Sequence, residues 1–457
     1  MNCLPELQRE SKAARWRQHV LPSRERASVL IIVMWVAFGL VSVALYFAQS
    51  MIFELRASDN RVAELEAEQA IEGAARYVNY VLANSQQPGT LPDLQTYQHD
   101  AVPVGDATFW FIGRTDQQVL TDEPYFSLVD EASKLNLNTA TVDMLQKLPR
   151  MTPELAAAIV DWRDSDDNVT PSGAETDTYS RLRPPYKCKN APFETVDELR
   201  LVVGAELEIL YGEDSNLNGI LDLNENDGNV SPPDDNRDGH LDPGIFEYVT
   251  VYSREPNVQS DGSKRVSVTD SQALARLLQQ QFGAQRANQV LGRGRGANYS
   301  SVLEFYIASG MTADEFEKVQ DALTASNGQY VEGLVNVNTA SEAVLACIPG
   351  IGTEKAPTLV AQRRSNPQTV VTMAWVKDVL DQPSAKAAGP FLTGRTYQFS
   401  ADIAAVGHHG RGYRRTRFIF DTSEGTPRIR YRQDLSHLGW ALGRQTRQRL
   451  LLANNSK

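Results

Sequence analysis

The residues with the clearest chemistry lie in one short acidic segment. Asp214 opens a stretch that follows the pattern D-x-[DN]-x-[DN]-G-x5-E, with Gly219 at its sharp turn. Carboxylate, amide and main-chain oxygens at these spacings surround one Ca²⁺, and a closing glutamate supplies two oxygens. This pattern predicts a calcium site whose ligands are Asp214, Asn216, Asn218, Ile220, Asp222 and Glu225.

A second, less complete match follows in the same segment. Ile245 stands at its closing position and has no side-chain oxygen, so Glu247 would have to replace it. Neither loop lies between two helices, because Val196–Leu210 predicts a helix and Ile245–Tyr252 alternates like a strand. We therefore expect structural calcium loops, and the alternative for both is a solvated acidic segment with Asn-Gly turns. The second ligand set is Asp234, Asn236, Asp238, His240, Asp242 and Glu247.

The charge of the chain is concentrated in this segment. Between Glu206 and Glu247 there are twelve acidic residues and one basic residue, Arg237, which gives −11 of the total of −12. The rest of the chain is close to neutral, so overall acidity says little about partners. A local acidic cluster favours a cation as the ligand over a nucleic acid.

The elements that carry these loops begin with a long N-terminal helix. Ala27–Phe53 contains no charged residue and is long enough to cross a bilayer, and a buried core helix is the alternative. Six lysines and arginines precede it, which predicts a cytoplasmic N-terminus and an extracytoplasmic remainder. A charged helical pattern continues over Glu54–Tyr80, and no proline interrupts Ala27–Gln87. We expect one continuous helix.

A motif recurs at an offset of 200 residues. Ten of the 29 residues in 135–163 are identical to their counterparts in 335–363. Each copy predicts a short strand that enters a helix, with Thr139 and Thr339 as N-caps and Glu342 completing a capping box in the second copy.

Each first helix is expected to end at a proline, Pro149 or Pro349, before a second helix, as in a helix-hairpin-helix. A Gly-x-Gly turn at a helix N-terminus can hold a phosphate, and only the second copy has one, Gly350–Gly352. No basic stripe runs along the chain. We expect packing modules and no bound nucleic acid, with a membrane-tethered DNA receptor as the alternative function.

The remaining reactive residues are few. Cys188 and Cys347 lie in the exported part, where a disulfide between them or two unpaired thiols are both compatible with the sequence. His408 and His409 are expected in a surface turn. The sequence has no nucleophile elbow, phosphate loop or zinc signature, so an enzyme is not expected.

Together these features resemble the K-type minor pseudopilins (GspK family) of type II secretion. In that family a prepilin peptidase cuts before the apolar helix, and the matching bond here joins Ala27 to Ser28. The family's usual glycine before the cut is replaced by Ala27. Ile32 occupies the fifth mature position, where other pseudopilins have glutamate and K-type subunits lack it. The other stretches that carry the resemblance are 125–138, 192–212, 249–253 and 335–340.

The resemblance implies an α+β fold. A long N-terminal transmembrane helix would pack on a pilin-like antiparallel sheet, into which a large, calcium-binding helical domain with the two helix-hairpin-helix-like repeats is inserted. The expected divisions are a cleaved leader 1–27, a helix 28–84 whose residues 28–50 span the membrane, sheet residues 85–134, an insertion 135–334 with calcium loops in 214–247, a second repeat 335–380, C-terminal strands 381–437 and a tail 438–457.

The resemblance also implies a function. K-type subunits sit at the tip of the pseudopilus with I- and J-type minor subunits, above the major pseudopilin, and act in assembly of the pseudopilus and in protein export. The chain is thus expected to be a single-pass inner-membrane protein with a cytoplasmic N-terminus, a periplasmic bulk and bound calcium.

Overall fold

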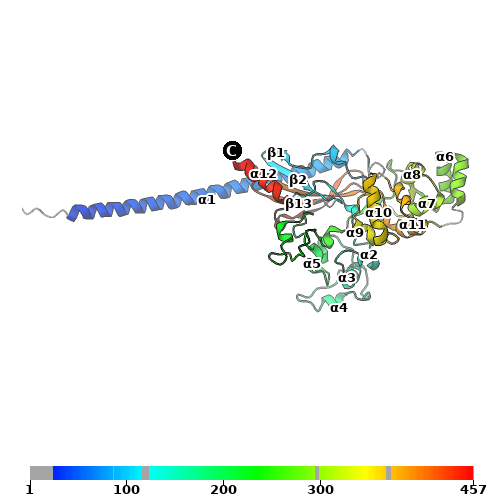
Figure 1. The fold of residues 1–457 in the computed structure, drawn as a ribbon, viewed down its shortest axis with the longest axis horizontal. Coiled ribbons are helices and arrows are strands. Elements are labelled where there is room, and N and C mark those ends of the chain that lie inside the picture. Colours follow the sequence, from blue (N-terminus) through cyan, green and yellow to red (C-terminus); the bar gives the residue numbers. More distant parts are fainter. Residues whose placement is uncertain (1–23, 86, 116–122, 294–297, 367–371, 456–457) are drawn as a thin grey trace, which may run out of the picture. The chain divides into compact units, whose positions relative to one another are not determined.

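The computed structural model describes residues 24–85, 87–115, 123–293, 298–366 and 372–455. Most of the predicted leader lies outside these residues. The chain divides after Arg61 into two compact units, which are described separately. Helix α1 runs without a break over Arg24–Ala83, as the absence of proline predicts (Figure 1). Its part from Val29 onward is long and apolar enough to cross a membrane, with a mean hydropathy of 2.6 in the most apolar window.

The sheet of the second unit is antiparallel, with the order β1-β2-β12-β13-β14 and β3 paired to β12. β2 and β12 are neighbours although most of the chain separates them, so the intervening residues form an insertion into the sheet, as predicted. The strands are β1 Val102–Val104, β2 Ala107–Ile112, β3 Val129–Asp130, β12 Gln398–Val406, β13 Arg414–Asp421 and β14 Arg428–Asp434.

One face of this sheet is covered by the later turns of α1. Alanines recur at helical spacing on the contacting side of the helix, and their small side chains let the backbone approach the strands closely. Aromatic side chains from the sheet fill the space against them, and each buried ring contributes about 2 kcal/mol. The principal contacts are Ala67, Ala70, Ala74 and Val78 of α1 and Phe109, Phe111, Phe399, Phe418 and Phe420 of the sheet.

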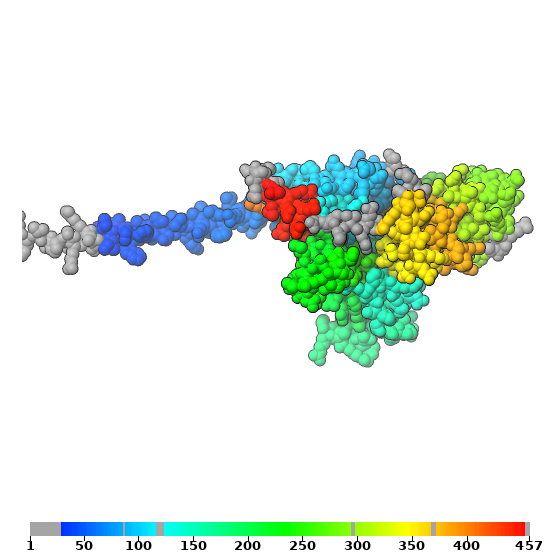
Figure 2. All heavy atoms as spheres, in the orientation of Figure 1, coloured from blue at the N-terminus to red at the C-terminus, as the bar shows by residue number. Residues whose placement is uncertain are grey.

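The opposite face of the sheet holds a smaller core. Trp110 and Ile112 of β2 pack there with Ala441 and Leu442, which lead into α12 (Gly443–Asn455). Figure 2 shows α12 as the red surface. The segment predicted to be a tail therefore contributes to the core of the sheet.

The insertion has one core that reaches from Leu135 to Leu392 and includes both copies of the repeat. The segments predicted as 135–334 and 335–380 share this core. Its helices are α2 Val142–Leu145, α3 Pro153–Arg163, α4 Thr176–Tyr179, α5 Leu207–Tyr211, α6 Ser271–Arg293, α7 Val302–Ser309, α8 Ala313–Val319, α9 Glu342–Cys347, α10 Gly352–Ser365 and α11 Gln382–Ala388.

Short strand pairs link these helices. The first strand of each copy has a parallel partner: β4 (Leu135–Asn136) pairs with β5 (Val249–Thr250), and β10 (Val335–Asn336) pairs with β11 (Leu392–Thr393). The remaining pairs are β6 Arg254–Pro256 with β9 Tyr330–Glu332, and β7 Val266–Ser267 with β8 Leu323–Thr324. The two copies adjoin through α2 and α9, and Figure 2 shows their teal and yellow surfaces side by side.

Single 3₁₀ turns complete the secondary structure. They are η1 Leu94–Thr96, η2 Glu131–Ser133, η3 Val196–Leu201, η4 Leu223–Glu225, η5 Ile245–Glu247, η6 Gln320–Ala322, η8 Ala374–Asp378, η9 Gly389–Phe391, η10 His408–Gly410 and η11 Ser436–Leu438. Two local predictions are wrong here. The helix expected over Val196–Leu210 is divided into η3 and α5, and the strand expected over Ile245–Tyr252 is reduced to β5 because η5 precedes it.

The predicted helix caps of the repeat are also wrong by two residues. The N-caps are Thr141 and Ser341, whose hydroxyl oxygens accept from the N–H of Met144 and Val344, both at 3.3 Å. Thr339 instead donates its hydroxyl to Asp130 at 2.5 Å, so it forms no capping box. Each first helix stops before its proline, and a second helix follows it in both copies.

Candidate metal centre

The first acidic loop is buried and folds around its own carboxylates. Asp214 is 1% exposed and Glu225 is fully buried. The carboxylate of Asp214 accepts from the N–H groups of Asn218 and Gly219, both at 2.9 Å. Glu225 accepts from the N–H groups of Ser215 and Asp222, both at 3.0 Å. The first and last positions of the loop are thereby fixed by backbone contacts with the residues between them.

The middle positions of this loop converge on one carboxylate. The amide nitrogens of Asn216 and Asn218 donate to Asp222 Oδ2 at 2.7 and 3.0 Å. Oδ1 of Asn216 is buried and has no hydrogen-bond partner. A rotation of either amide would replace its nitrogen by its oxygen at the same place, so the three side chains can present oxygens to a common ion.

The electrostatics of this loop also favour a cation. Burial, followed by the charge of Asp214, raises the pKa of Glu225 to about 8. Burial is likewise the first cause that raises the pKa of Asp214, against the opposing charge of Arg114. Two buried carboxylates that repel each other are stabilised as anions by a divalent cation. The residues of the first loop therefore fit calcium by the kind of atom they offer and by an orphaned oxygen.

Two arginines hold this loop against the sheet. Arg415 of β13 is fully buried, donates to the carbonyl oxygens of Asn216 and Leu217, and forms an ion pair with Asp402 of β12 at 2.8 Å. Arg114, after β2, donates to the same Leu217 carbonyl at 3.1 Å. The loop is therefore coupled to the central strands of the sheet.

The second acidic loop is more exposed and less converged. Asp238 and Asn236 are exposed, and each accepts from a backbone N–H two residues further on, at 2.7 and 2.8 Å. Asp242 pairs with Arg150 at 2.8 Å. Glu247, the predicted substitute ligand, forms an ion pair with Arg114 at 2.7 Å. Calcium binding by this loop stays a prediction, and Glu247 would have to leave Arg114 to take part.

The second repeat uses its candidate phosphate-binding groups inside the protein. Lys355 lies 3.2 Å from Asp381 and also donates to Ser384 of α11. Arg363 is 7% exposed and donates to the carbonyls of Val337 and Ala340 at 3.0 and 2.8 Å. A side chain at Gly350 would come within 2.6 Å of the Ser384 carbonyl, so α11 covers this turn. The geometry favours a packing role for the repeat.

The two cysteines are unpaired in the structure, so the disulfide that the sequence left open is not formed. Both are buried. The Cys188 thiol donates to the Asp161 carbonyl at 3.6 Å, and the Cys347 thiol donates to the Ala343 carbonyl at 3.2 Å. Burial raises the pKa of each thiol to about 12, which keeps both protonated.

The predicted processing site lies at the start of α1. The histidine pair lies beside a later turn of the same helix, at Glu66. The backbone of Ala27 and Ser28 is helical, and the first 23 residues of the leader lie outside the described residues. His408 lies in η10, the predicted turn, and its Nδ1 is 2.7 Å from Glu66 of α1. This contact helps to fix the turn between β12 and β13 on the helix.

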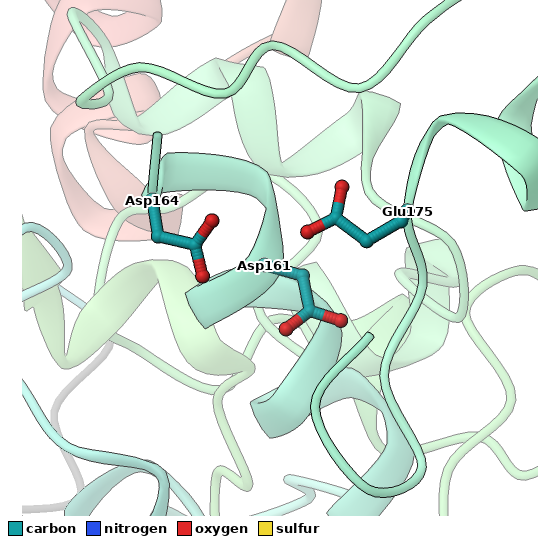
Figure 3. Close-up of side chains that lie close together, drawn as sticks. All are labelled: Asp161, Asp164 and Glu175. Carbon is teal, nitrogen blue, oxygen red and sulfur yellow. The ribbon is translucent and has the colours of Figure 1, made fainter. Parts of the chain in front are cut away.

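Sequence reasoning missed two groups of buried charges. Arg415 and Asp402 read as ordinary strand residues, and no local signal marks them. Asp161, Asp164 and Glu175 come together around the end of α3 (Figure 3). A comparison of the two copies of the repeat could have marked Asp161 and Asp164, because the second copy has Ala361 and Arg364 at the equivalent positions.

Comparisons with known proteins bear on the region that joins the sheet to the first repeat. A family model described as "Type II secretion system (T2SS), protein K" matches residues 127–211. Over these residues the chain is similar to the protein K family of type II secretion systems. That region contains β3, β4, the first copy of the repeat and the acidic group at the end of α3, so the match lies at the junction of insertion and sheet.

Two individual proteins are similar to this chain. Type II secretion system protein K of Pectobacterium carotovorum subsp. carotovorum is 31% identical over 97 residues, which cover 21% of this chain and 27% of that protein. The matched part thus spans about a quarter of that relative. A chain in the solved GspK-GspI-GspJ complex from enterotoxigenic Escherichia coli aligns with a TM-score of 0.40 and 12% identity, over 81% of this chain and 97% of that one.

Proposed function

We propose that this chain is a minor pseudopilin at the tip of a type II secretion pseudopilus, with a structural and not a catalytic role. The match of residues 127–211 to the protein K family carries this proposal. The continuous apolar helix and the antiparallel sheet that it covers support it, because a subunit of a helical filament needs both an anchor and a head. In this role the protein assists pseudopilus assembly and export across the outer membrane.

The proposed partners are the I- and J-type minor pseudopilins, with the major pseudopilin below them. A protein named GspK forms a complex with GspI and GspJ in enterotoxigenic Escherichia coli, which motivates this choice of partners. The large insertion between β3 and β12 would hinder the addition of another subunit above this one. A tip subunit also has no subunit ahead of it whose N-terminus could pair with a carboxylate in the membrane. This agrees with Ile32 at the position where other pseudopilins have glutamate.

Anchoring and processing can be tested on the whole chain. We propose that α1 anchors the protein in the inner membrane with the bulk in the periplasm, after prepilin peptidase cuts between Ala27 and Ser28. Co-expression with the cognate peptidase should give an intact mass that starts at Ser28. An uncut chain starting at Met1 would contradict the pseudopilin proposal.

Calcium at residues 214–225 is proposed as a structural ion. It would neutralise Asp214 and Glu225 and fix the loop whose carbonyls contact Arg415. Removal of calcium with a chelator should lower the Tm of the full-length protein in detergent, and Asp214→Asn should reduce that calcium-dependent change. Equal Tm values with and without calcium would exclude this role.

A secretion assay tests the function itself. In a strain lacking its own K-type subunit, expression of this chain should restore release of a secreted enzyme into the medium. Deletion of residues 1–53 provides the control, because it removes the proposed anchor and leaves the sheet intact. Full secretion without the chain, or with the truncated chain, would contradict the proposal.

A further inference from the structure

The C-terminal segment differs in charge from the rest of the chain. From Leu435 to Lys457 the sequence has no acidic residue, whereas the whole chain has a net charge of −12. Its basic residues are Arg444, Arg447, Arg449 and Lys457. A local excess of positive charge in an otherwise acidic protein favours an anionic partner for that segment.

The helix in this segment, α12, has an inner and an outer face. Thr446 is 2% exposed and Leu450 is half-buried, and Leu450 packs with the small core on this side of the sheet. On the outer face Arg447 precedes Leu451 by one helical turn, and Leu451 and Leu452 are 57% and 69% exposed. Arginines combined with exposed leucines are typical of helices that lie on membrane surfaces.

The positive charge of α12 is only partly compensated within the protein. Arg449 donates to Glu123, and the Thr446 hydroxyl donates to the same carboxylate at 2.9 Å. Arg447 is exposed and forms no ion pair with any residue that the structure describes. Because α12 itself contains no acid, the charge of Arg447 remains available to an anionic ligand.

α12 lies at the end of the sheet where residues 62–66 of α1 meet it (Figure 1). It adjoins η10, the turn between β12 and β13, and His408 of this turn contacts Glu66. The loop around this turn lies directly on α1, because a side chain at Gly407 or Gly412 would come within 2.1 or 2.3 Å of the Ala63 backbone. α12 is therefore held beside this part of α1.

The length of chain between α12 and the expected membrane span is short. That span ends at Ser50, thirteen residues before Ala63, and thirteen helical residues cover about 20 Å. The headgroup region on one side of a bilayer takes about 5–8 Å of this length. The remaining gap of about 12–15 Å compares with the diameter of about 10–12 Å of one helix with its side chains. A helix beside Ala63 is thus within reach of the headgroups.

A solvated surface helix is the first alternative for α12, because single exposed apolar residues are common on proteins. Here two adjacent leucines, Leu451 and Leu452, are both more than half exposed. Solvated helices also usually interleave both signs of charge, as the part of α1 over Glu54–Tyr80 does, whereas α12 has only positive residues. A partner subunit with an acidic surface is the second alternative.

We propose that α12 lies on the periplasmic surface of the membrane that anchors the chain. Its arginines would contact the phosphate groups of anionic lipids, and Leu451 and Leu452 would lie between the headgroups. This inference rests on the proposed anchoring by α1 and adds a second, reversible membrane contact to it. Apolar burial and attraction to anionic lipids both strengthen such a contact. It would fix the orientation of the sheet relative to the membrane, which a single helix leaves free.

A fluorescent reporter on α12 tests this contact in the full-length chain. Gln448→Cys, on the exposed face, carries a bimane label, and the chain is reconstituted in nanodiscs whose lipids carry a quencher on the headgroup. Cys3→Ser removes the leader thiol, and Cys188 and Cys347 are buried, so the chain without Gln448→Cys gives the labelling background.

An exposed glutamine of α6 provides the matched reporter. Gln280→Cys places the same label on a helix that Figure 1 shows at the opposite end of the second unit from α12. In nanodiscs of phosphatidylcholine mixed with phosphatidylglycerol, the label on α12 should be quenched at least about threefold more than the label on α6. In phosphatidylcholine alone this difference should shrink, and NaCl should reduce it in the anionic nanodiscs because salt screens exposed charges.

Charge variants identify the groups responsible. Arg444→Gln together with Arg447→Gln should lower the quenching of the α12 label in anionic nanodiscs to its value in neutral ones. Arg181→Gln together with Arg276→Gln removes the same charge from exposed positions of the insertion and should leave the quenching unchanged. The comparison of the two lipid compositions needs neither variant, so it decides the question even if a variant fails to fold.

Equal quenching of the two labels in anionic nanodiscs would overturn the proposal. A change in emission of the α12 label that appears only on addition of the I- and J-type subunits, without a response to anionic lipid, would assign this face to a protein partner and would also overturn it. A chain that does not enter nanodiscs would contradict the anchoring by α1 as well. A chain that enters them without quenching at α12 contradicts this inference alone, and the intact-mass and secretion results stand.

Discussion

The two copies of the repeat have the same backbone framework but different charged residues. In both, a short strand pairs with a distant strand, a hydroxyl caps the first helix, and an arginine of the second helix, Arg163 or Arg363, donates to carbonyls at the start of the copy. The copies differ at the end of that helix, where the first has Asp161 and Asp164. This comparison indicates that the identical residues maintain the framework, whereas the differing residues are the ones free to take on a separate role in each copy.

The turn between the two helices sharpens this contrast. Gly350 has φ +81°, and its counterpart Arg150 has φ +60° despite its side chain. The framework therefore imposes the same left-handed turn on both sequences. Glycine is required in the second copy because α11 covers the turn, whereas the Arg150 side chain in the first copy has space to reach Asp242.

The largest expected effect follows from this turn. Gly350→Ala should destabilise the protein by about 3 kcal/mol, because a left-handed alanine is strained and its Cβ would overlap the Ser384 carbonyl. Arg150→Ala, the matched change in the first copy, should cost less than about 1 kcal/mol, since it removes only a partly exposed ion pair. Chemical denaturation of both variants measures the difference, and equal losses of stability would contradict the view that only the second turn is covered and requires glycine.

A smaller effect is expected at the shared arginine. Arg363→Met should cost about 2 kcal/mol, because it removes two buried hydrogen bonds to the Val337 and Ala340 carbonyls. Arg163→Met should cost less, since Arg163 is only partly buried. Urea unfolding at neutral pH measures both. A greater loss of stability in Arg163→Met than in Arg363→Met would contradict the expectation that the more buried arginine contributes more.

The smallest expected effect is a change of pH dependence at Asp130, which joins the sheet to the second copy. Its carboxylate accepts from Asn336 and Thr339, and burial raises its pKa to about 6. A folded-state pKa above the unfolded value means that protonation favours the folded form, so this contribution to stability is complete below pH 4 and is lost as the pH rises through 6.

Asp130→Asn should remove this contribution, so the difference in Tm between the wild type and the variant should vary between pH 4 and 7 and be constant above 7. Asp143→Asn, at an exposed acid of α2 for which the second copy has Ala343, is the matched control for the loss of one negative charge. A constant difference for Asp130→Asn would mean that this carboxylate titrates normally.

The sequence predicted the large elements of the fold because their signals are local and repeated. The uncharged run from Ala27 and the lack of proline define α1, and β12 to β14 lie within residues 381–437, where C-terminal strands were expected. The insertion followed from the family resemblance. The helix caps were predicted at Thr139 and Thr339 because threonine is a good N-cap and both residues lie just before a helix. Tertiary contacts, such as that of the Thr339 hydroxyl with Asp130, use these side chains elsewhere.

The burial and convergence of the acidic loop at residues 214–225 could be predicted from spacing alone, since its side chains lie close together in the sequence, whereas calcium binding by this loop stays a prediction. The group at the end of α3 could not, because Glu175 comes from a polar stretch that reads as a variable loop and meets α3 only in three dimensions. Arg415 was missed for the same reason: its contacts to Asn216 and Leu217 join residues about 200 positions apart.

The central claim is that this chain acts as a K-type minor pseudopilin, and assembly with its partners tests it most directly. The full-length protein should be co-expressed with the I- and J-type subunits of the same secretion system, purified in detergent through a tag on this chain, and weighed by native mass spectrometry. The account predicts a ternary complex with one copy of each subunit. Recovery of this chain alone, under conditions in which the other two subunits bind each other, would contradict it.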